Sequence, residues 1–292
     1  MANERNPIDP VTGVPTTGHE WDGVKELNNP LPRWWLWLFY VTIIWSIGYW
    51  IFYPSWPLAS NYTIGLFNWH SRQALVNDLQ SLTSERAPMT GKLASASLPD
   101  ILADPQLAGF SRALGKAVFG ENCAGCHGAG AGGAKGYPNL LDDDWIWGGK
   151  IDDIAQTIRH GIRATDEKTR MGPMPAFGRD GILNRADINA VVDYVRSLAK
   201  LQVAANADLA KGKKVFAEQC ASCHGEDGKG NRELGALNLT DNIWLYGPSR
   251  ETIMETVVNG RNGVMPAWAG RLDDTTIKAL AVYVHTLGGG EK

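Results

Sequence analysis

Apolar residues follow two patterns along this 292-residue chain, one continuous and one periodic. The continuous run covers residues 34–53, which include no charged side chain. A helix rises about 1.5 Å per residue, so one of this length spans the roughly 30 Å hydrocarbon core of a bilayer. Tryptophan and tyrosine lie at both ends of the run, where amphipathic rings favour the headgroup level. The run predicts a transmembrane helix, with the lipid bilayer as a partner of the chain.

Two competing interpretations of this run are a cleaved signal peptide and a buried core helix. The run exceeds the usual apolar segment of about 7 to 15 residues in a signal peptide, and no clear small-x-small cleavage site follows it. So many tryptophans along one helix are not expected in the core of a soluble domain, which argues against a buried core helix. We therefore expect an uncleaved anchor that follows a tail at 1–33. Residues 54–105 show no repeat, and they predict a tether with one short helix near 73–84.

The periodic pattern occurs twice in the second half of the chain. Residues 188–198 (INAVVDYVRSL) and 277–287 (IKALAVYVHTL) carry apolar side chains at i, i+3, i+4, i+7 and i+10. This spacing predicts two amphipathic helices. Asn184 precedes the first helix, and Asp273 or Asp274 precedes the second, where such side chains cap free backbone N–H groups.

The two helices close two copies of one repeated unit. The copies share a cysteine motif and a methionine motif, which read CAGCH and CASCH at 123–127 and 220–224, and MPAFG and MPAWA at 174–178 and 265–269. Each unit runs from a helix through the cysteine motif, a glycine-rich loop and a methionine loop to the closing helix. The repeat predicts a mainly α protein with two tandem domains, at 106–200 and 201–292.

The cysteine motif CxxCH is the attachment pattern of c-type haem. Two thiols one helical turn apart add to the vinyl groups of the macrocycle, and the next residue, a histidine, faces the iron. The sequence predicts two covalently bound haem c groups, attached at Cys123, Cys126, Cys220 and Cys223, with the proximal ligands His127 and His224. A CxxC redox pair and a zinc site are alternatives, but neither requires a histidine directly after the second cysteine in both repeats.

The repeat alignment selects Met174 and Met265 as the sixth ligands of the two irons. Met171 competes with Met174 because the first methionine loop is longer, and His160 is a further candidate whose repeat partner is Asn259. Histidine and methionine together leave iron six-coordinate and raise its reduction potential. An iron closed in this way has no substrate site, which favours electron transfer over a dihaem peroxidase and predicts no catalytic residues.

Other residues are expected around the macrocycles. A ligand histidine usually donates its second ring N–H to an acceptor, and the carbonyl groups of Pro138 and Leu237 suit that role. Trp145, Trp147 and Trp244 either line a haem edge, donate to a propionate, or simply pack in a core.

Charge adds little to this picture. The chain has 28 Lys and Arg against 31 Asp and Glu, and the balance holds in each third of the sequence. This distribution predicts no nucleic-acid partner, and it gives no clue to a docking face.

Residues from about 110 to 290 resemble the class I cytochrome c fold in both units. The order of tail, span, tether and two such units is similar to the CcoP (FixP) family, the dihaem subunits of cbb3-type cytochrome c oxidases. The segment TTGHEWDGVKELNNPLPRWWLWLFY, residues 16–40, is the most discriminating part of this resemblance.

This resemblance implies an electron relay without a catalytic centre of its own. Its haems would accept electrons from a donor cytochrome c and pass them through a monohaem subunit to the oxygen-reducing haem–copper subunit. It also implies a bacterial inner membrane, a cytoplasmic tail at 1–33, and a periplasmic tether and haem domains. The alternative is a free-standing anchored dihaem cytochrome, or the cytochrome subunit of a periplasmic dehydrogenase, which would share the units but not the tail.

Overall fold

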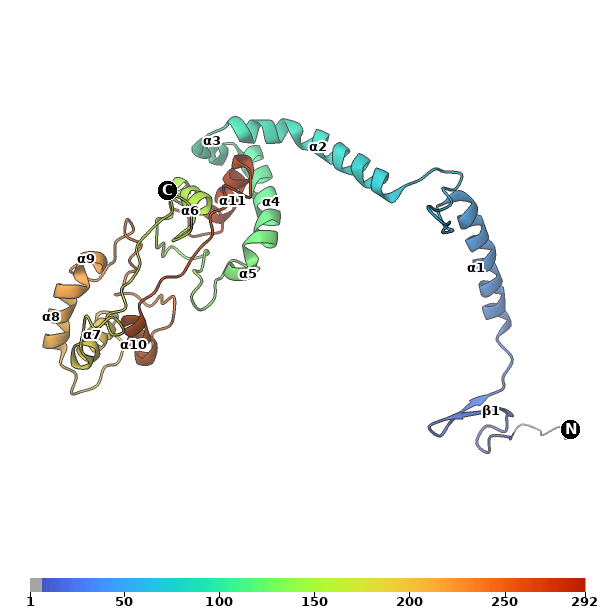
Figure 1. Ribbon diagram of the computed structural model, residues 1–292, viewed down its shortest axis with the longest axis horizontal. Coiled ribbons are helices and arrows are strands. Elements are labelled where there is room, and N and C mark those ends of the chain that lie inside the picture. The colour runs from blue at the N-terminus through green and yellow to red at the C-terminus, as the bar shows by residue number, and fades with distance from the viewer. Residues whose placement is uncertain (1–6, 292) are drawn as a thin grey trace. The chain divides into compact units, whose positions relative to one another are not determined.

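A computed structural model describes residues 7–291 of the chain (Figure 1). Residues 1–6 of the predicted tail lie outside the described residues. The chain divides between Glu85 and Arg86 into two compact units, which are considered one at a time.

The first unit begins with a β-hairpin. Strands β1 (Thr16–Trp21) and β2 (Val24–Leu27) pair antiparallel, with Trp21 opposite Val24. Asp22 and Gly23 connect them with φ angles of 49° and 86°, the left-handed pair that a tight hairpin turn requires. This stretch was predicted only as part of a tail, although Asp-Gly is a hairpin turn signal.

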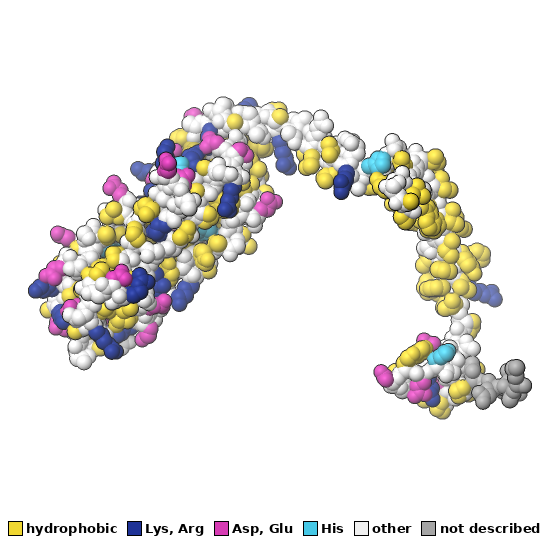
Figure 2. Space-filling model, in the orientation of Figure 1, with side chains coloured by type: hydrophobic (Ala, Val, Ile, Leu, Met, Phe, Trp, Pro, Cys, Tyr) yellow, Lys and Arg dark blue, Asp and Glu magenta, His cyan; other side chains and the backbone are white. Residues whose placement is uncertain are grey.

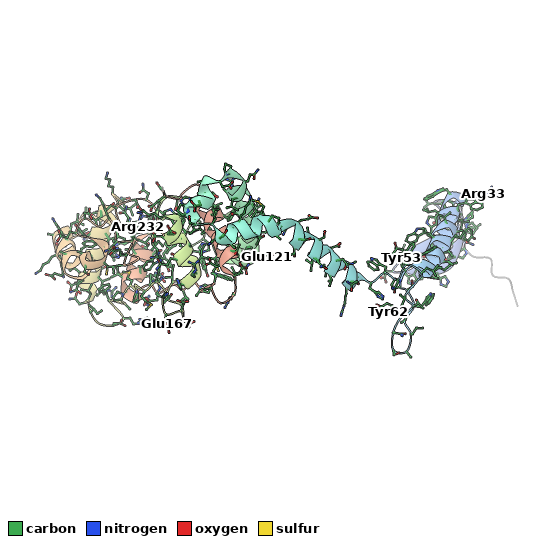
Figure 3. The ribbon with its side chains drawn as sticks, turned by 90° about the horizontal axis from the view of Figure 1, so that it is seen from above. Arg33, Tyr53, Tyr62, Glu121, Glu167 and Arg232 are labelled. Atoms are coloured by element: carbon green, nitrogen blue, oxygen red, sulfur yellow. The ribbon has the colours of Figure 1, made fainter. Side chains whose placement is uncertain are left out.

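Helix α1 (Arg33–Phe52) confirms the predicted apolar helix to within one residue at each end. It is long and apolar enough to cross a membrane, and none of its apolar window is buried against the rest of the chain. Figure 2 shows its visible face covered by hydrophobic side chains, and Figure 3 labels Arg33 at its start and Tyr53 just beyond its end. The exposed apolar surface of α1 fits a membrane anchor.

Helix α2 (Ser71–Ser95) is longer than the short helix predicted near 73–84. Its last turns belong to the second unit, because Leu93 has no exposed surface and joins the same core as Ile101. The ammonium group of Lys278 holds the end of α2 through the carbonyl oxygens of Ala94 and Ala96, at 2.8 and 2.9 Å. Residues 86–105, which the sequence analysis assigned to the tether, therefore pack within the second unit.

The second unit is helical and holds two hydrophobic cores. Its remaining helices are α3 (Leu98–Ala103), α4 (Pro105–Asn122), α5 (Ala124–His127), α6 (Ile151–His160), α7 (Arg185–Leu198), α8 (Leu209–Gln219), α9 (Ala221–His224), α10 (Arg250–Asn259) and α11 (Asp274–His285). The side chains of Asn184 and Asp273 cap α7 and α11 as predicted.

The two cores exchange their closing helices. Helix α11 packs against α4 and α6, whereas α7 packs against α8 and α10 (Figure 1). We call residues 86–160 together with 265–291 lobe A, and residues 174–259 lobe B. The packed lobes therefore differ from the consecutive domains predicted at 106–200 and 201–292, because each closing helix lies on the opening helix of the other repeat.

A close helix crossing explains the glycines that the two repeats share. A Cβ atom at Gly115 of α4 would overlap the carbonyl oxygen of Ala279, and one at Gly212 of α8 would overlap that of Ala190. One turn further on, the rings of Phe119 and Tyr283 lie 5.4 Å apart. The equivalent pair in lobe B, Tyr194–Phe216, lies 5.5 Å apart, so the same contact is built in both lobes.

Candidate haem-binding sites

Each cysteine motif forms one short helical turn at the end of a longer helix. In lobe A, Cys123 is the C-cap of α4, and its carbonyl oxygen accepts the backbone N–H groups of Cys126 and His127 at 3.1 and 3.0 Å. Gly128, at φ 80°, ends this turn and starts the glycine-rich loop. The turn thus brings two thiols and one imidazole to the same edge of the lobe.

Lobe B repeats this arrangement. The carbonyl oxygen of Cys220 accepts the backbone N–H groups of Cys223 and His224 at 3.1 and 2.9 Å, and Gly225 ends the turn at φ 78°. The second cysteine of each motif, Cys126 or Cys223, is exposed, and the first is partly buried.

The two candidate ligand histidines contact the predicted backbone carbonyl groups. Nδ1 of His127 lies 3.1 Å from the oxygen of Pro138, and Nδ1 of His224 lies 2.9 Å from that of Leu237. A carbonyl can only accept, so Nδ1 carries the proton and Nε2 keeps its lone pair for a metal. Burial lowers the pKa of both rings, more than these hydrogen bonds raise it, and so favours the neutral form that ligates iron.

The thiols do not resemble a redox-active pair. Burial, together with the neighbouring cysteine, raises the pKa of Cys123 and of Cys220 to about 11. Reactive CxxC cysteines have lowered pKa values, because the thiolate is the nucleophile. Within residues 7–291, no group of three His, Cys, Asp or Glu side chains is placed to hold a metal ion such as zinc.

Met265 belongs to lobe A, the lobe of His127. Its backbone N–H donates to the oxygen of Ile162 at 3.0 Å, and the N–H of Ile162 donates back at 2.9 Å. Its side chain packs, partly buried, against the core of lobe A. Gly161, at φ +69°, permits this approach, because a Cβ there would overlap the carbonyl oxygen of Met265.

Met174 belongs to lobe B, the lobe of His224. It exchanges backbone hydrogen bonds of 3.1 and 3.3 Å with Arg261, and its side chain packs against the core of lobe B. Gly260, at φ +68°, allows the same close approach that Gly161 allows in lobe A. The structure thus places each methionine beside the cysteine motif of the other repeat.

The local competitors of Met174 lie elsewhere. The side chain of Met171 is 60% exposed and belongs to neither core. Nδ1 of His160 lies 3.0 Å from a carboxylate oxygen of Asp166, so this ring has a partner within its own loop. Both observations favour Met174 as the ligand.

The three tryptophans near the cysteine motifs have different surroundings. Trp145 donates its indole N–H to the carbonyl of Gly289 at 2.6 Å, and Trp147 is buried in lobe A with the guanidinium of Arg170 5.5 Å from its ring centre. Trp244 packs against the core of lobe B, and its buried indole N–H has no acceptor within the described chain.

A second unpaired buried donor, Nη2 of Arg261, lies in the segment that pairs with Met174 of lobe B. The Arg261 guanidinium stacks on the ring of Tyr246 at 3.9 Å, and its Nε donates to Thr256 at 3.0 Å. Buried donors nearly always have partners, and a haem propionate offers the missing acceptor oxygens. The residues present therefore fit a haem.

Sequence reasoning missed this arginine and its repeat partner, Arg170. Each stands four residues before a candidate methionine ligand, and Arg170 donates from Nε to Thr157 at 2.8 Å just as Arg261 does to Thr256. The equal spacing in both repeats was the available signal.

The two repeats define the chain as a cytochrome with two class I cytochrome c domains in tandem along the sequence, and α1 fits a membrane anchor. Comparison with family models agrees for three segments. Residues 13–60 match the N-terminal domain of cytochrome oxidase-cbb3, FixP; residues 112–199 match cytochrome c; and residues 207–284 match cytochrome c oxidase, cbb3-type, subunit III.

Full-length relatives place the chain more narrowly. It is 59% identical to the cbb3-type cytochrome c oxidase subunit FixP of Azorhizobium caulinodans, over 98% of this chain and 97% of the relative. It is 51% identical to the subunit CcoP of Cereibacter sphaeroides, over 95% and 96% of the two chains. The chain belongs to the FixP/CcoP family of cbb3-type cytochrome c oxidase subunits. It is an electron-transfer component of that oxidase and contains haem-binding cytochrome c domains.

Proposed function

We propose that this chain carries two covalently bound haem c groups and relays single electrons from a donor cytochrome c toward the monohaem and haem–copper subunits of its oxidase. The observation that carries the proposal is the paired geometry of the two lobes. Each lobe combines a CxxCH turn, a histidine fixed at Nδ1 by a carbonyl, and a methionine loop packed on the same core. The bound haem irons supply the one-electron chemistry.

The proposed ligand sets are crossed between the repeats. In lobe A, Cys123 and Cys126 hold the macrocycle, and His127 and Met265 ligate the iron. In lobe B, the corresponding residues are Cys220, Cys223, His224 and Met174. The crossing is supported by the backbone pairs Ile162–Met265 and Met174–Arg261, which seat each methionine loop in its lobe.

The chain's own residues would hold the irons in a closed form. The carbonyl groups of Pro138 and Leu237 orient the two imidazoles, and the methionine loops occupy the opposite side. A six-coordinate site excludes oxygen and peroxide from the iron, and it changes little in geometry between its two oxidation states. This arrangement suits a relay and leaves oxygen reduction to a partner subunit.

We further propose that α1 spans the bacterial inner membrane with the tail in the cytoplasm and both lobes in the periplasm. Lys25 precedes the span, Arg33 is its first residue and Arg72 follows it, a small bias in the direction of the positive-inside rule. Covalent haem attachment takes place on the periplasmic side, which requires the cysteine motifs to be there. Periplasmic protease digestion of spheroplasts should remove the lobes and spare the tail.

The ligand assignment is tested by optical redox titration of the full-length chain in detergent. Met174→His and Met265→His should each lower the midpoint potential of one haem and leave the other unchanged, because imidazole stabilises ferric iron better than thioether does. If neither variant changes the titration, the methionines are not ligands. Peroxide turnover by the wild-type chain would contradict a pair of closed irons.

The crossed pairing is tested in chains that keep only one haem. With Cys220 and Cys223 replaced by alanine, Met265→His should shift the remaining haem and Met174→His should not. With Cys123 and Cys126 replaced, the two methionine variants should exchange their effects. The opposite pattern would mean that each repeat supplies its own methionine. Copurification with a haem–copper subunit separates the oxidase role from a free-standing cytochrome, which would always purify alone.

A further inference from the structure

The first repeat contains an insertion that the second lacks. Gly161 aligns with Gly260, and Arg170 aligns with Arg261, which directly follows Gly260, so the first repeat has eight additional residues between the glycine and the arginine. The insertion closes on itself through a 2.8 Å hydrogen bond from the N–H of Arg163 to the carbonyl of Arg170. Its tip, at Glu167, is exposed (Figure 3). The segment thus forms a small loop between α6 and the Met174 loop.

The side chain of Arg163 joins the two methionine loops. Its Nε donates to the carbonyl oxygen of Gly263 at 2.7 Å, and its Nη1 donates to that of Gly172 at 3.0 Å. Gly263 stands two residues before Met265, and Gly172 stands two residues before Met174. One guanidinium therefore binds equivalent positions of both loops, one of which leads into lobe A and the other into lobe B.

The charge of Arg163 is not neutralised by an acid in the described chain. Within residues 7–291, no carboxylate oxygen lies within 4.0 Å of this guanidinium. Burial lowers the pKa of Arg163, and the neighbouring Tyr246 partly opposes this, but arginine stays protonated in proteins. The backbone at Arg163 has φ 49°, an unusual conformation for a residue other than glycine. With this conformation the side chain extends toward the two methionine loops.

We propose that Arg163 is a positioning residue that fastens the two axial methionine loops to each other and adds one positive charge between the two haem sites. The proposal rests on the ligation proposed above. Two carbonyl oxygens in different loops match the rigid fork of a guanidinium, whereas an ammonium group is a single point charge on a flexible stem. A cation near both irons disfavours the ferric state, which carries one more positive charge, and so raises both potentials.

The test uses the full-length, haem-loaded chain in detergent and three variants. Arg163→Gln removes the charge and the fork, and Arg163→Lys keeps the charge but not the fork. Lys168→Gln is the matched control, since Lys168 is exposed and lies in the same insertion. The measurements are the methionine-to-iron charge-transfer band of each ferric haem, the pH at which that band is lost, and the redox titration of each haem.

In Arg163→Gln we expect the band to weaken at both haems. We also expect the reduced-to-oxidised ratio of both, at a fixed applied potential, to fall about tenfold, equivalent to about 59 mV for a one-electron couple. In Arg163→Lys the ratio should stay within about threefold of the wild type, while the band is lost at lower pH. Lys168→Gln should behave as the wild type. A change confined to one haem, or no larger than in the control, overturns the proposal.

The ligand variants separate this proposal from the one on which it rests. If Met174→His and Met265→His leave the bands intact, the methionines are not ligands and both proposals fail. If they remove the bands while both Arg163 variants match the wild type, only the role of Arg163 fails. Should Arg163→Gln not accumulate in membranes, Arg163→Lys decides through the pH at which the band is lost.

Discussion

The buried ion pair of lobe B is the clearest place to test how the two lobes differ. Arg250, at the start of α10, binds Asp193 of α7 in a bidentate arrangement at 2.8 and 3.1 Å, and it also donates to Asn189 at 2.9 Å. The repeat alignment places Ile151 and Val282 at the equivalent positions of lobe A. Both are buried there, so lobe A fills these two positions of its helix contact with apolar side chains.

Two single variants, Arg250→Ile and Asp193→Val, should lower the free energy of unfolding by different amounts. Arg250→Ile leaves the Asp193 carboxylate unpaired at 7% exposure, and breaking a buried pair in this way costs about 3 to 5 kcal/mol. Asp193→Val leaves the Arg250 side chain, which is 38% exposed and keeps its bond to Asn189. Water can reach that guanidinium, so we expect about 1.5 to 3 kcal/mol, the value of a hydrogen bond to a charged group.

The double variant Arg250→Ile/Asp193→Val recreates the contact of lobe A. Replacing a buried pair by apolar residues of similar size is often neutral or stabilising, so it should lie within about 1 kcal/mol of the wild type. The assay is denaturant unfolding of the haem-loaded chain, followed by the absorbance of the lobe B haem and analysed as a double-mutant cycle. The reasoning would be refuted if the stability losses of the two single variants added up in the double variant. It would also be refuted if Arg250→Ile lost less stability than Asp193→Val.

Three further outcomes follow from local geometry. Gly115→Ala should destabilise lobe A by about 1 to 3 kcal/mol through overlap with α11, whereas Gly120→Ala in the same helix meets nothing within 4 Å and should stabilise by about 0.5 kcal/mol in thermal unfolding. Burial, reinforced by Asp241 and Asp142, raises the pKa of Asp144 to about 6. Its raised folded pKa weakens folding as pH rises from about 4 to 6, so Asp144→Asn should be more stable than the wild type at pH 7 and show a flatter pH profile. The hydroxyl and backbone N–H of Thr276 donate to Asp273 and lower its pKa, so the carboxylate stabilises α11 at neutral pH and loses this effect below about pH 4. Asp273→Ala should therefore lower the free energy of unfolding by about 1 kcal/mol at pH 7. Equal melting temperatures of the variant and the wild type at that pH would contradict this.

Local sequence signals correctly predicted three helices, two caps and two histidine–carbonyl contacts. The apolar run became α1, and the periodic segments became α7 and α11 with the expected caps. The carbonyl partners of His127 and His224 could be found because the glycine-rich loop after a CxxCH turn returns over the histidine at a similar distance in both repeats. Each of these features depends on residues close together in the chain.

The exchange of closing helices could not be predicted in this way. Both helix crossings use the same pieces, a glycine and a phenylalanine on one helix and a tyrosine on the other, so α7 and α11 each suit either partner. Pairing between distant segments then depends on the course of the connecting loops. The same limit hid Arg163, whose two acceptors lie 9 and 100 residues away.

The crossed packing also makes the order of synthesis matter. Lobe B is one continuous stretch, 174–259, whereas lobe A begins at residue 86 and is complete only with α11, which follows lobe B in the chain. The first cysteine motif therefore emerges before the second, but its lobe is completed last. A stop codon after residue 261 would keep Arg261, which pairs with Met174, and would leave the pocket of the first motif unfinished.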